Sequence, residues 1–224
     1  MFDAPMAFTG ASLNWYRDTF AEHEVLMAKQ AGLNVFSLFD KYASASDPGA
    51  EASSTCYMGN TLSPNWNPSS KGIFFGASIG TTKADWLRAL MEGVAFDLFS
   101  NIKIALASGA KIDKLTLNGG PTKSSFWNRI TADVTGIPLE TTNVDEAAPL
   151  GDAILAAKGA GTLPVTDRTS QPSGESDRSI EPDPAVHEMY MDFYTIWERV
   201  YQNLKSELDD HHKLLFKYNM GKRS

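Results

Sequence analysis

The sequence of 224 residues contains a single cysteine, Cys56, and no long run of hydrophobic residues. One cysteine cannot form a disulfide within the chain, which fits a reducing compartment. No hydrophobic run approaches the ~20 residues that a membrane-spanning helix needs, and no segment reads as a signal peptide. We therefore expect a cytoplasmic protein without a membrane partner.

Positive charge is also scarce in this sequence. Its 20 lysine and arginine residues are outnumbered by 27 aspartate and glutamate residues, which gives a formal net charge of −7. Nucleic-acid binders usually carry a basic surface that neutralises phosphates, so no nucleic-acid partner is expected. An acidic domain can still hold a phosphorylated ligand, because helix N-termini and loop amides bind phosphate without net positive charge.

Patterns typical of metal sites and hydrolases are missing as well. His187 stands alone, and His211 and His212 are adjacent, so their side chains would point about 100° apart on a helix. No cysteine or carboxylate lies at ligand spacing from them, and we expect no metal site built by this chain. Ser124 and Ser125 lack the Gly-x-Ser-x-Gly context of a hydrolase nucleophile.

What the sequence does contain is an alternation of strand and helix patterns. Short apolar runs predict strands at 72–76, 115–117 and 137–140. Apolar residues spaced by three and four predict helices at 84–108, 124–135 and 146–158. Strands that alternate with helices are typical of an α/β layer architecture. We therefore expect a mixed sheet with these helices packed against it.

The flanking regions predict further helices. Helical spacing indicates one helix over 11–31 and a short one over 35–42, whereas 162–184, with four prolines, indicates a surface loop. A final helix carries an apolar stripe made of Tyr190, Phe193, Trp197, Tyr201, Leu204 and Leu208. Such a stripe is either an interaction surface or part of the core. Amphipathic helices mostly pack this face on their own domain, and we expect that here.

The segment 115–127 is the best candidate for chemistry. A predicted strand runs into Gly119 and Gly120 and then into a helix that begins near Lys123 and Ser124. Glycines permit a tight turn and a close approach of backbone to a flat ligand, and a helix N-terminus favours phosphate. The pattern is neither the Walker phosphate loop nor the dinucleotide fingerprint. Taken alone, it also fits a plain strand-to-helix turn.

Four motifs resemble, in order, the conserved stretches of the FGGY family of carbohydrate kinases. They are GIFFG followed by Asp85 and ALMEGVAF within 72–96, GGPTKSSFW at 119–127, ITADVTGIP at 130–138 and EAAPLGDAI at 146–154. Ala77 and Trp86 stand where the family usually has aliphatic residues, and Pro121 stands for a third glycine. The resemblance is strong over 63–161 and weaker toward both termini.

The resemblance implies an α/β domain with a ribonuclease-H-like core, of the actin-like ATPase superfamily, in which helices flank a mixed sheet. Residues 1–224 would form the C-terminal, nucleotide-binding domain of such a kinase. Within it we distinguish a variable N-terminal segment at 1–62, a motif-bearing core at 63–161, a surface loop at 162–184, and a C-terminal helix and tail at 185–224.

The resemblance also implies a nucleotide site, because the family holds ATP mostly on this domain and the sugar mostly on the N-terminal one. Carried over position by position, the site comprises Gly76, Gly119, Gly120, Pro121, Lys123 and Ser124. Gly120 and Ser124 match positions that touch the adenosine. Gly76 matches a glycine whose backbone approaches the phosphates. Whether the charge of Lys123 reaches ATP stays open.

Phosphoryl transfer also needs Mg²⁺ and a base that receives the hydroxyl proton. The family uses an aspartate in a Gly-Asp-Gln-like motif, followed by a Gly-Thr phosphate turn, and neither pattern is present. Asp18, Asp40 and Asp47 lack that motif and are interpreted as solvated surface carboxylates. No catalytic residue is therefore assigned. Asp133 and Glu146 are expected to hold helices in place.

The leading interpretation is the ATP-binding domain of a kinase that transfers the γ-phosphate to a sugar. Ketopentose kinases of the xylulokinase type are the nearest general match, which makes xylulose the leading acceptor. The flanks 8–20 and 182–190 look similar to the kinase of the furanosyl autoinducer signal, which is the alternative. A non-catalytic nucleotide-binding regulatory or assembly module is the alternative from another class.

The missing base gives two further expectations. A missing N-terminal domain, or a separate chain, would supply the base, so this chain alone should be inactive. The face that would meet that half should be bare, and large bare apolar patches tend to find partners. We therefore expect a homodimer formed through this surface.

Overall fold

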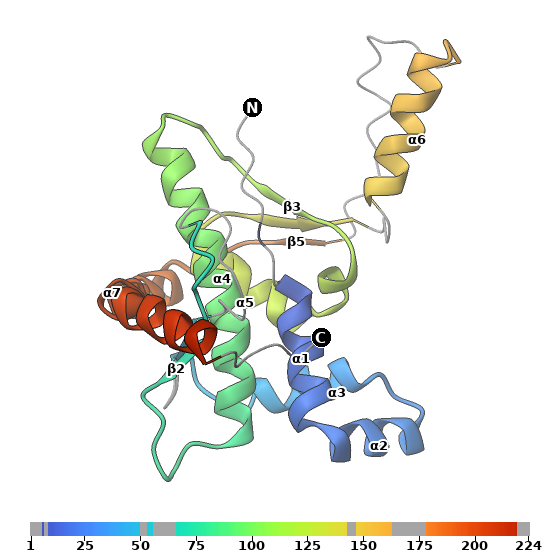
Figure 1. The fold of residues 1–224 in the computed structure, drawn as a ribbon. Helices are drawn as coiled ribbons and strands as arrows, with labels where there is room; N and C mark the ends of the chain where they lie inside the picture. Colours follow the sequence, from blue (N-terminus) through green and yellow to red (C-terminus); the bar gives the residue numbers. More distant parts are fainter. Residues whose placement is uncertain are drawn as a thin grey trace.

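The computed structural model describes residue 6 and residues 9–49, 53–55, 66–142, 147–162 and 178–218. In chain order the helices and strands are α1 (Thr9–Phe20), α2 (Glu22–Ala31), α3 (Val35–Ala43), β1 (Ser53–Thr55), β2 (Ile73–Phe75), α4 (Lys83–Ala107), β3 (Leu115–Leu117), the 3₁₀ helix η1 (Gly120–Lys123), α5 (Ser125–Thr135), β4 (Leu139–Thr141), α6 (Ala147–Gly159), β5 (Arg178–Ile180) and α7 (Pro184–Lys217). Figure 1 shows β3 and β5 lying alongside α4 and α5, with α1, α2 and α3 grouped at one end.

The strands form two small sheets. β3 and β4 are parallel, and β5 joins β4 in the antiparallel direction, so that Leu139 faces Leu115 on one side and Ile180 on the other. β1 and β2 form a separate antiparallel pair. Helix α5 contacts both β4 and β5. The prediction of a mixed sheet flanked by helices is confirmed.

Helix α4 begins at a network of hydrogen bonds around Asp85. The backbone N–H and the hydroxyl of Thr82 both donate to this carboxylate at 2.7 Å, and the Ser46 hydroxyl donates at 2.6 Å. An N-cap of this kind satisfies donors that the first helical turn leaves free. The hydrogen bonds from Ser46 and Thr82 hold the pKa of Asp85 below its ordinary value.

Asp85→Asn is therefore expected to lower the free energy of unfolding by about 1–2 kcal/mol at neutral pH, because hydrogen bonds to a charged acceptor are lost. A carboxyl with a lowered folded pKa stabilises fully above its unfolded pKa, about 4. That stability is lost as pH falls through the folded pKa. Urea unfolding of both proteins between neutral and acidic pH should thus show a difference that shrinks on acidification. A constant difference would contradict this account.

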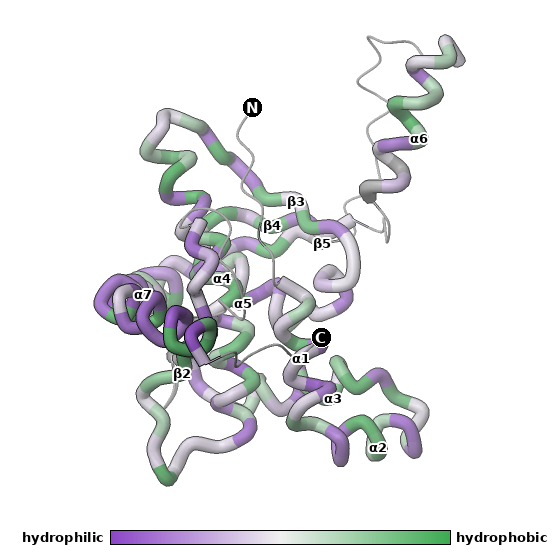
Figure 2. Tube along the Cα trace, in the orientation of Figure 1, coloured by the Kyte–Doolittle hydropathy of each residue, from purple (hydrophilic) through white to green (hydrophobic). Residues whose placement is uncertain are grey.

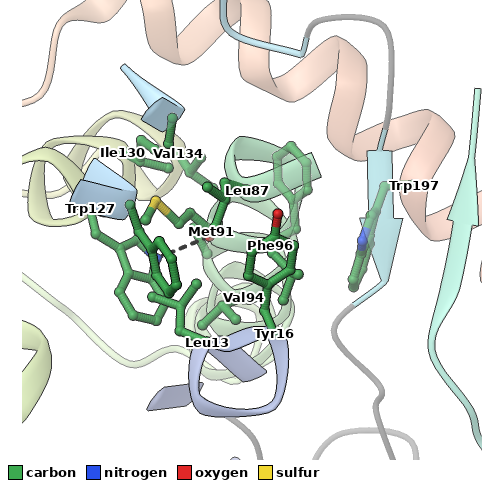
Figure 3. Close-up of a cluster of buried hydrophobic side chains, with 14 of the residues drawn as sticks. Leu13, Tyr16, Leu87, Met91, Val94, Phe96, Trp127, Ile130, Val134 and Trp197 are labelled. Carbon is green, nitrogen blue, oxygen red and sulfur yellow. Dashed lines mark hydrogen bonds between the residues drawn. The ribbon is translucent and has the colours of Figure 1, made fainter. Parts of the chain in front are cut away.

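The hydrophobic core lies where α1, α3, α4, α5 and α7 meet. Figure 3 shows Met91 and Val94 of α4 beside Trp127 of α5 and Leu13 of α1. The indole N–H of Trp127 donates to the Met91 carbonyl at 3.1 Å, so this buried ring keeps its polar atom paired. α4 is therefore the central helix of the domain.

Most of the predicted stripe of α7 packs on this core, whereas Leu204, which was predicted to be part of it, is exposed. Tyr190, Tyr194, Trp197 and Tyr201 are buried at spacings of four, three and four. The ring of Phe96 in α4 lies 5.8–6.0 Å from the first three of these rings. Tyr194, which was not predicted from the sequence, is thus part of the stripe.

Among the described residues, no helix is long and apolar enough to cross a membrane.

Two helices differ from the prediction. The helix predicted over 11–31 is broken at Ala21, whose side chain is completely buried where α1 ends and α2 begins. Neither glycine nor proline marks this break, so tertiary packing decides it. The expected packing of 146–158 on the sheet is also not observed: α6 projects away from it in Figure 1, and Leu155 is 70% exposed.

A physical reason for the position of α6 lies in its composition. Figure 2 shows hydrophobic positions along α6, but its sequence, AAPLGDAILAAKG, is dominated by small residues. Small side chains bury little apolar area per turn, while alanine has the highest helix propensity. The helix therefore has little apolar area with which to pack on the sheet.

Candidate nucleotide site

A cavity of about 300 Å³ lies between α1, α3 and the loop that joins β3 to α5. Its lining consists of Gly10, Leu13, Asn14, Asn34, Phe36, Ser37, Asp40, Gly120, Pro121, Lys123, Ser124 and Trp127. Four of the six residues predicted from the sequence are in this lining, and Gly119 immediately precedes them. The volume is at the lower end of the range of about 300–1,000 Å³ that is usual for small-molecule sites.

The two glycines of the loop have different roles. Gly119 has φ 82° and ψ −161°, a conformation that is almost restricted to glycine. Its carbonyl accepts from the Thr122 N–H at 3.1 Å and the Thr122 hydroxyl at 2.7 Å, which fixes the turn. At Gly120 a β-carbon would meet no atom within 4 Å, because the position opens onto the cavity. Gly119 therefore shapes the loop, and Gly120 keeps space free.

Ser124 joins this loop to α3. Its hydroxyl accepts from the Trp127 N–H at 3.0 Å, as an N-cap, and donates to Asp40 at 2.8 Å. Its own N–H donates to the Pro121 carbonyl at 3.1 Å. The hydroxyl and the backbone N–H of Ser124 thus both donate within the protein. The structure gives Ser124 a positioning role.

Asp40 corrects one expectation. It is half-buried and lines the cavity, whereas it was expected to be a solvated surface carboxylate. Burial raises its pKa, and the hydrogen bond from Ser124 opposes that rise. Asp18 and Asp47 are exposed, as expected, and Asp18 pairs with Arg17 at 2.7 Å. The helical packing of α3 against the loop, which no motif signals, accounts for the burial of Asp40.

Ser124→Ala should therefore act first on stability. We expect the free energy of unfolding to fall by about 1–2 kcal/mol, because the α5 cap is lost and the partly buried Asp40 loses its partner. Urea denaturation measures this change. The exposed neighbour Ser125 is the matched control, and Ser125→Ala should change stability by less than about 0.5 kcal/mol. Equal losses in both variants would contradict the capping role.

Gly76 is placed apart from the other predicted residues, whereas Lys123 lies with them. Gly76 lies exposed after β2, with φ 82°, and is not among the residues that line this cavity. The structure thus does not bring it to the loop of Gly120. Lys123 is exposed and does line the cavity.

The structural role expected for Asp133 agrees with its contacts. It is buried in α5, accepts from the Asp183 N–H at 2.9 Å and lies 3.7 Å from Arg129. Burial raises its pKa, and the Asp183 hydrogen bond opposes this. Asp133 therefore ties α5 to the start of α7. Glu146, for which the same role was expected, lies outside the described residues.

The opposite wall of the cavity was not predicted from the sequence. Gly10 and Asn14 come from α1, and Asn34 and Phe36 from the start of α3. Asn34 caps α3 by accepting from the Phe36 N–H at 3.0 Å, and an asparagine shortly after Gly32 is a signal that could have located this helix start. No local pattern, however, shows that α1 and α3 face the glycine loop.

The cavity can bind a planar molecule but has few groups for acid–base chemistry. Leu13, Phe36 and Trp127 provide apolar contacts, Asn14 and Asn34 carry side-chain amides, and Asp40 is the one carboxylate among the lining residues. Within the described ranges, no group of three or more histidine, cysteine, aspartate or glutamate residues could hold a metal ion.

Comparison with known proteins finds relatives that are sugar kinases or kinases of a sugar-like signal. The chain is 33% identical over 206 residues to an autoinducer-2 kinase of Salmonella paratyphi A, which covers 90% of this chain and 39% of the relative. It is 31% identical over 197 residues to a xylulose kinase of Staphylococcus epidermidis, and this alignment covers 88% of this chain and 38% of the relative. The chain therefore spans about two fifths of the length of these relatives.

Solved structures show the same relationship. The ligand-bound xylulose kinase from Lactobacillus acidophilus has a TM-score of 0.77 at 21% identity, covering 93% of this chain and 40% of that one. The xylulose kinase from Rhodospirillum rubrum has a TM-score of 0.73 at 26% identity, covering 91% of this chain and 40% of that one. These likenesses confirm the predicted actin-like ATPase fold.

The family model that describes the C-terminal domain of FGGY carbohydrate kinases matches residues 1–160. This match covers more than half of the chain. The chain belongs to the FGGY family of carbohydrate kinases.

Proposed function

We propose that the chain is the ATP-binding domain of a sugar kinase and that the cavity between α1, α3 and the 119–124 loop receives the adenosine of ATP. The observation that carries this proposal is the position of Gly120, Pro121, Lys123 and Ser124 around one cavity. These residues match the family's adenine-site motif, and α1 and α3, which are distant in sequence, complete the cavity beside them.

The lining has the chemistry that a nucleoside requires. Leu13 and Trp127 are buried apolar side chains on which a flat base can pack, while Asn14 and Asn34 place polar groups at the rim. Gly120 leaves the backbone open to close approach. Adenosine satisfies these demands because it combines a planar ring with several hydrogen-bonding edges.

The phosphates and Mg²⁺ need groups beyond this cavity. Mg²⁺ is usually held by one or two carboxylates together with substrate phosphates. Asp40 is the one carboxylate in the described lining, and it is already bonded to Ser124. We therefore assign no Mg²⁺ ligand or catalytic residue to this chain. The base and phosphate turn would come from an N-terminal domain or from a separate chain.

Two sugar substrates are compatible with the relatives. Xylulose, a ketopentose, is the leading proposal, because xylulose kinases are found both among the curated relatives and among the solved structures. The furanosyl autoinducer-2 is the alternative, because kinases of this signal reach 33% identity. ADP release by this chain joined to an N-terminal half of either type, measured with both sugars, distinguishes them.

A third proposal, from another class, is a non-catalytic regulatory or assembly module that keeps the nucleotide pocket.

Calorimetric titration with ATP–Mg²⁺ and adenosine tests all of these functions. We expect saturable, modest binding by the chain alone and no sugar phosphorylation. Phosphorylation after joining to an N-terminal half supports the kinase, whereas binding without any turnover supports the module. Absence of binding in both forms would refute the nucleotide site.

We also propose that the chain works in the cytoplasm and pairs with a second copy. A cytoplasmic location fits the single cysteine and the use of ATP. Pairing would cover exposed apolar side chains near the α1–α3 end, such as Phe20, Leu26 and Leu33, which are 52–60% exposed. Light scattering that shows a strict monomer at high concentration would contradict the pairing.

A further inference from the structure

Helix α7 continues well beyond the part that packs on the core. Its last fully buried residue is Tyr201, and the helix then runs on to Lys217 with mostly exposed side chains. At 1.5 Å per residue, this second half is about 24 Å long. The apolar side chains that stay exposed on it are therefore not explained by the domain's own core.

One strip of this half has the spacing of a face that pairs with another helix. Its residues follow one another at intervals of four and three in turn, and they are Val200, Leu204, Glu207, His211, Leu214 and Tyr218. At about 3.6 residues per turn, these positions lie within about 80° of one another around the helix. Leu204, Leu214 and Tyr218 are 37%, 51% and 62% exposed. We name this set of six residues the distal strip.

The distal strip is a different face of α7 from the one that meets the core. Seen along the helix axis, the buried aromatic residues between Tyr190 and Tyr201 are centred about 90° away from it. Leu208 and Leu215 continue that buried line and are only partly exposed, and Leu208 packs against the core. The distal strip therefore stays accessible when the core face is in place.

The distal strip is complementary to a second copy of itself in the antiparallel direction. When two strips cross at the level of residue 209, Glu207 of each copy lies opposite His211 of the other. Apolar residues meet on both sides of these polar pairs. A contact in which one position meets a second, and the second meets the first, is what a twofold axis produces. The resulting pairs are Glu207–His211, Leu204–Leu214 and Val200–Tyr218.

The two polar residues have capacity for such pairs. Both are exposed, and Glu207 accepts a hydrogen bond from the adjacent Ser206 hydroxyl at 2.8 Å. Within the described ranges, neither Glu207 nor His211 forms an ion pair. A carboxylate accepts several hydrogen bonds, so Glu207 can also accept from an imidazole N–H.

A parallel arrangement in register does not give this match. It would place each residue opposite the same residue of the other copy, so that Glu207 would face Glu207 and His211 would face His211. Like charges that face each other across an interface are unfavourable. The order of residues in the distal strip therefore favours the antiparallel direction.

We propose that two copies of this chain associate through an antiparallel pair of α7 helices along the distal strip. One helix from each copy makes a small interface, and small interfaces are typical of weak, reversible association. This surface is separate from the nucleotide cavity and from the exposed side chains near α1–α3, so it does not depend on the proposed kinase function. Use of both surfaces would link copies into tetramers or longer assemblies.

Sedimentation equilibrium of the full chain over a wide range of concentrations tests the surface. We expect a reversible dimer, and Leu204→Asp should raise its dissociation constant at least about tenfold, because a charge would be buried against Leu214. Phe216 is the matched control, since it is 85% exposed on the same helix but about 160° away from the strip. Phe216→Asp should change the dissociation constant by less than about twofold. Circular dichroism checks that each variant is folded.

An exchange of charges tests the register. Glu207→Lys should weaken the dimer at least about fivefold, because lysine would face His211. The double variant Glu207→Lys/His211→Glu should bring the dissociation constant back to within about twofold of the original, because acid and base then exchange places. No recovery in the double variant would contradict the antiparallel register.

Cysteine cross-linking tests the direction. In a Cys56→Ser background, which has no other cysteine, a chain with Leu204→Cys should form a disulfide with a chain carrying Leu214→Cys, because these positions lie opposite each other. Leu204→Cys alone should not cross-link, since its two copies would lie about 15 Å apart along the helix.

Four outcomes would each overturn the proposal. They are a strict monomer at the highest concentration, equal losses in Leu204→Asp and Phe216→Asp, cross-linking of Leu204→Cys with itself, and a dimer that is lost only with Leu26→Asp. The last outcome would assign pairing to the exposed side chains near α1–α3 instead.

Discussion

Replacing Gly120 with valine is expected to abolish ATP binding while the chain stays folded. A β-carbon at Gly120 would meet no protein atom within 4 Å, and this residue does not have a positive φ. The valine side chain would therefore cause no clash within the protein. It would instead fill part of a cavity of only about 300 Å³, where the proposed adenosine lies.

Calorimetric titration with ATP–Mg²⁺ measures this effect. We expect affinity to fall at least about a hundredfold, equivalent to ~2.8 kcal/mol, and the urea midpoint to change little. Gly159→Val is a matched control: its β-carbon also meets nothing within 4 Å, but it lies at the end of α6 and not in the cavity lining. Equal ATP binding by the original chain and Gly120→Val would place the nucleotide on another loop.

The neighbouring glycine gives a different expectation. Gly119 needs a positive φ of 82°, so Gly119→Ala should strain the turn and lower stability as well as binding. A loss of stability with Gly119→Ala, together with a loss of binding alone with Gly120→Val, would separate the two roles. Losses of stability in both variants would indicate that the loop only connects β3 to α5.

Local sequence signals located much of the fold. The predicted strand at 115–117 coincides with β3, and the helix predicted at 84–108 differs from α4 by one residue at each end. Both have strong local determinants: an apolar run ended by Asn118 and Gly119, and a cap formed by Thr82 and Asp85. Where local chemistry fixes an element, a single sequence is sufficient to find it.

Contacts between distant segments could not be found in this way. Ser124 bonds to Asp40 across 84 positions of sequence, and the break at Ala21 depends on burial against the core. The loop half of the candidate site was predicted because glycines and a helix start leave a local pattern. The half from α1 and α3 was not, because its residues acquire their role only through packing. Gly76 was assigned by resemblance, and its local pattern does not specify a partner.

Glu92, which lies in the ALMEGVAF motif, belongs to a buried polar network. The motif alone does not predict the partners of Glu92 in this network. The Arg88 guanidinium donates to Glu92 at 2.7 Å, to the Ser46 carbonyl at 2.6 Å and to the Tyr190 hydroxyl at 2.9 Å. Glu92 also accepts from the Tyr190 hydroxyl at 2.9 Å and from the Gly49 N–H at 3.2 Å. The network thereby joins α4 to α7 and to the segment after α3.

Both charges of this network are removed from water. Arg88 is 7% exposed and Glu92 is 3% exposed, and the guanidinium lies 5.4 Å from the centre of the Phe126 ring. Burial raises the pKa of Glu92, and the charge of Arg88 opposes that rise. Removing one partner therefore leaves the other as an unpaired buried charge, which typically costs about 3–5 kcal/mol.

We accordingly expect Arg88→Met and Glu92→Leu each to lower the free energy of unfolding by about 3–5 kcal/mol. The double variant should lose about 2–3 kcal/mol less than the sum of both, because it leaves neither charge unpaired. It should stay less stable than the original chain, since Ser46, Gly49 and Tyr190 lose their partners. Urea unfolding of the four proteins measures this coupling.

The exposed pair Lys103–Glu198 is the control for this cycle, because its side chains lie 3.1 Å apart but are 47% and 44% exposed. Its coupling energy should stay below about 1 kcal/mol, as is usual for solvated ion pairs. A large coupling for the buried pair with a small one for this pair would show that desolvation, rather than proximity of charge, makes the network cooperative. Additive losses from Arg88→Met and Glu92→Leu would mean instead that each side chain stabilises α4 through its own contacts with Ser46, Gly49 and Tyr190.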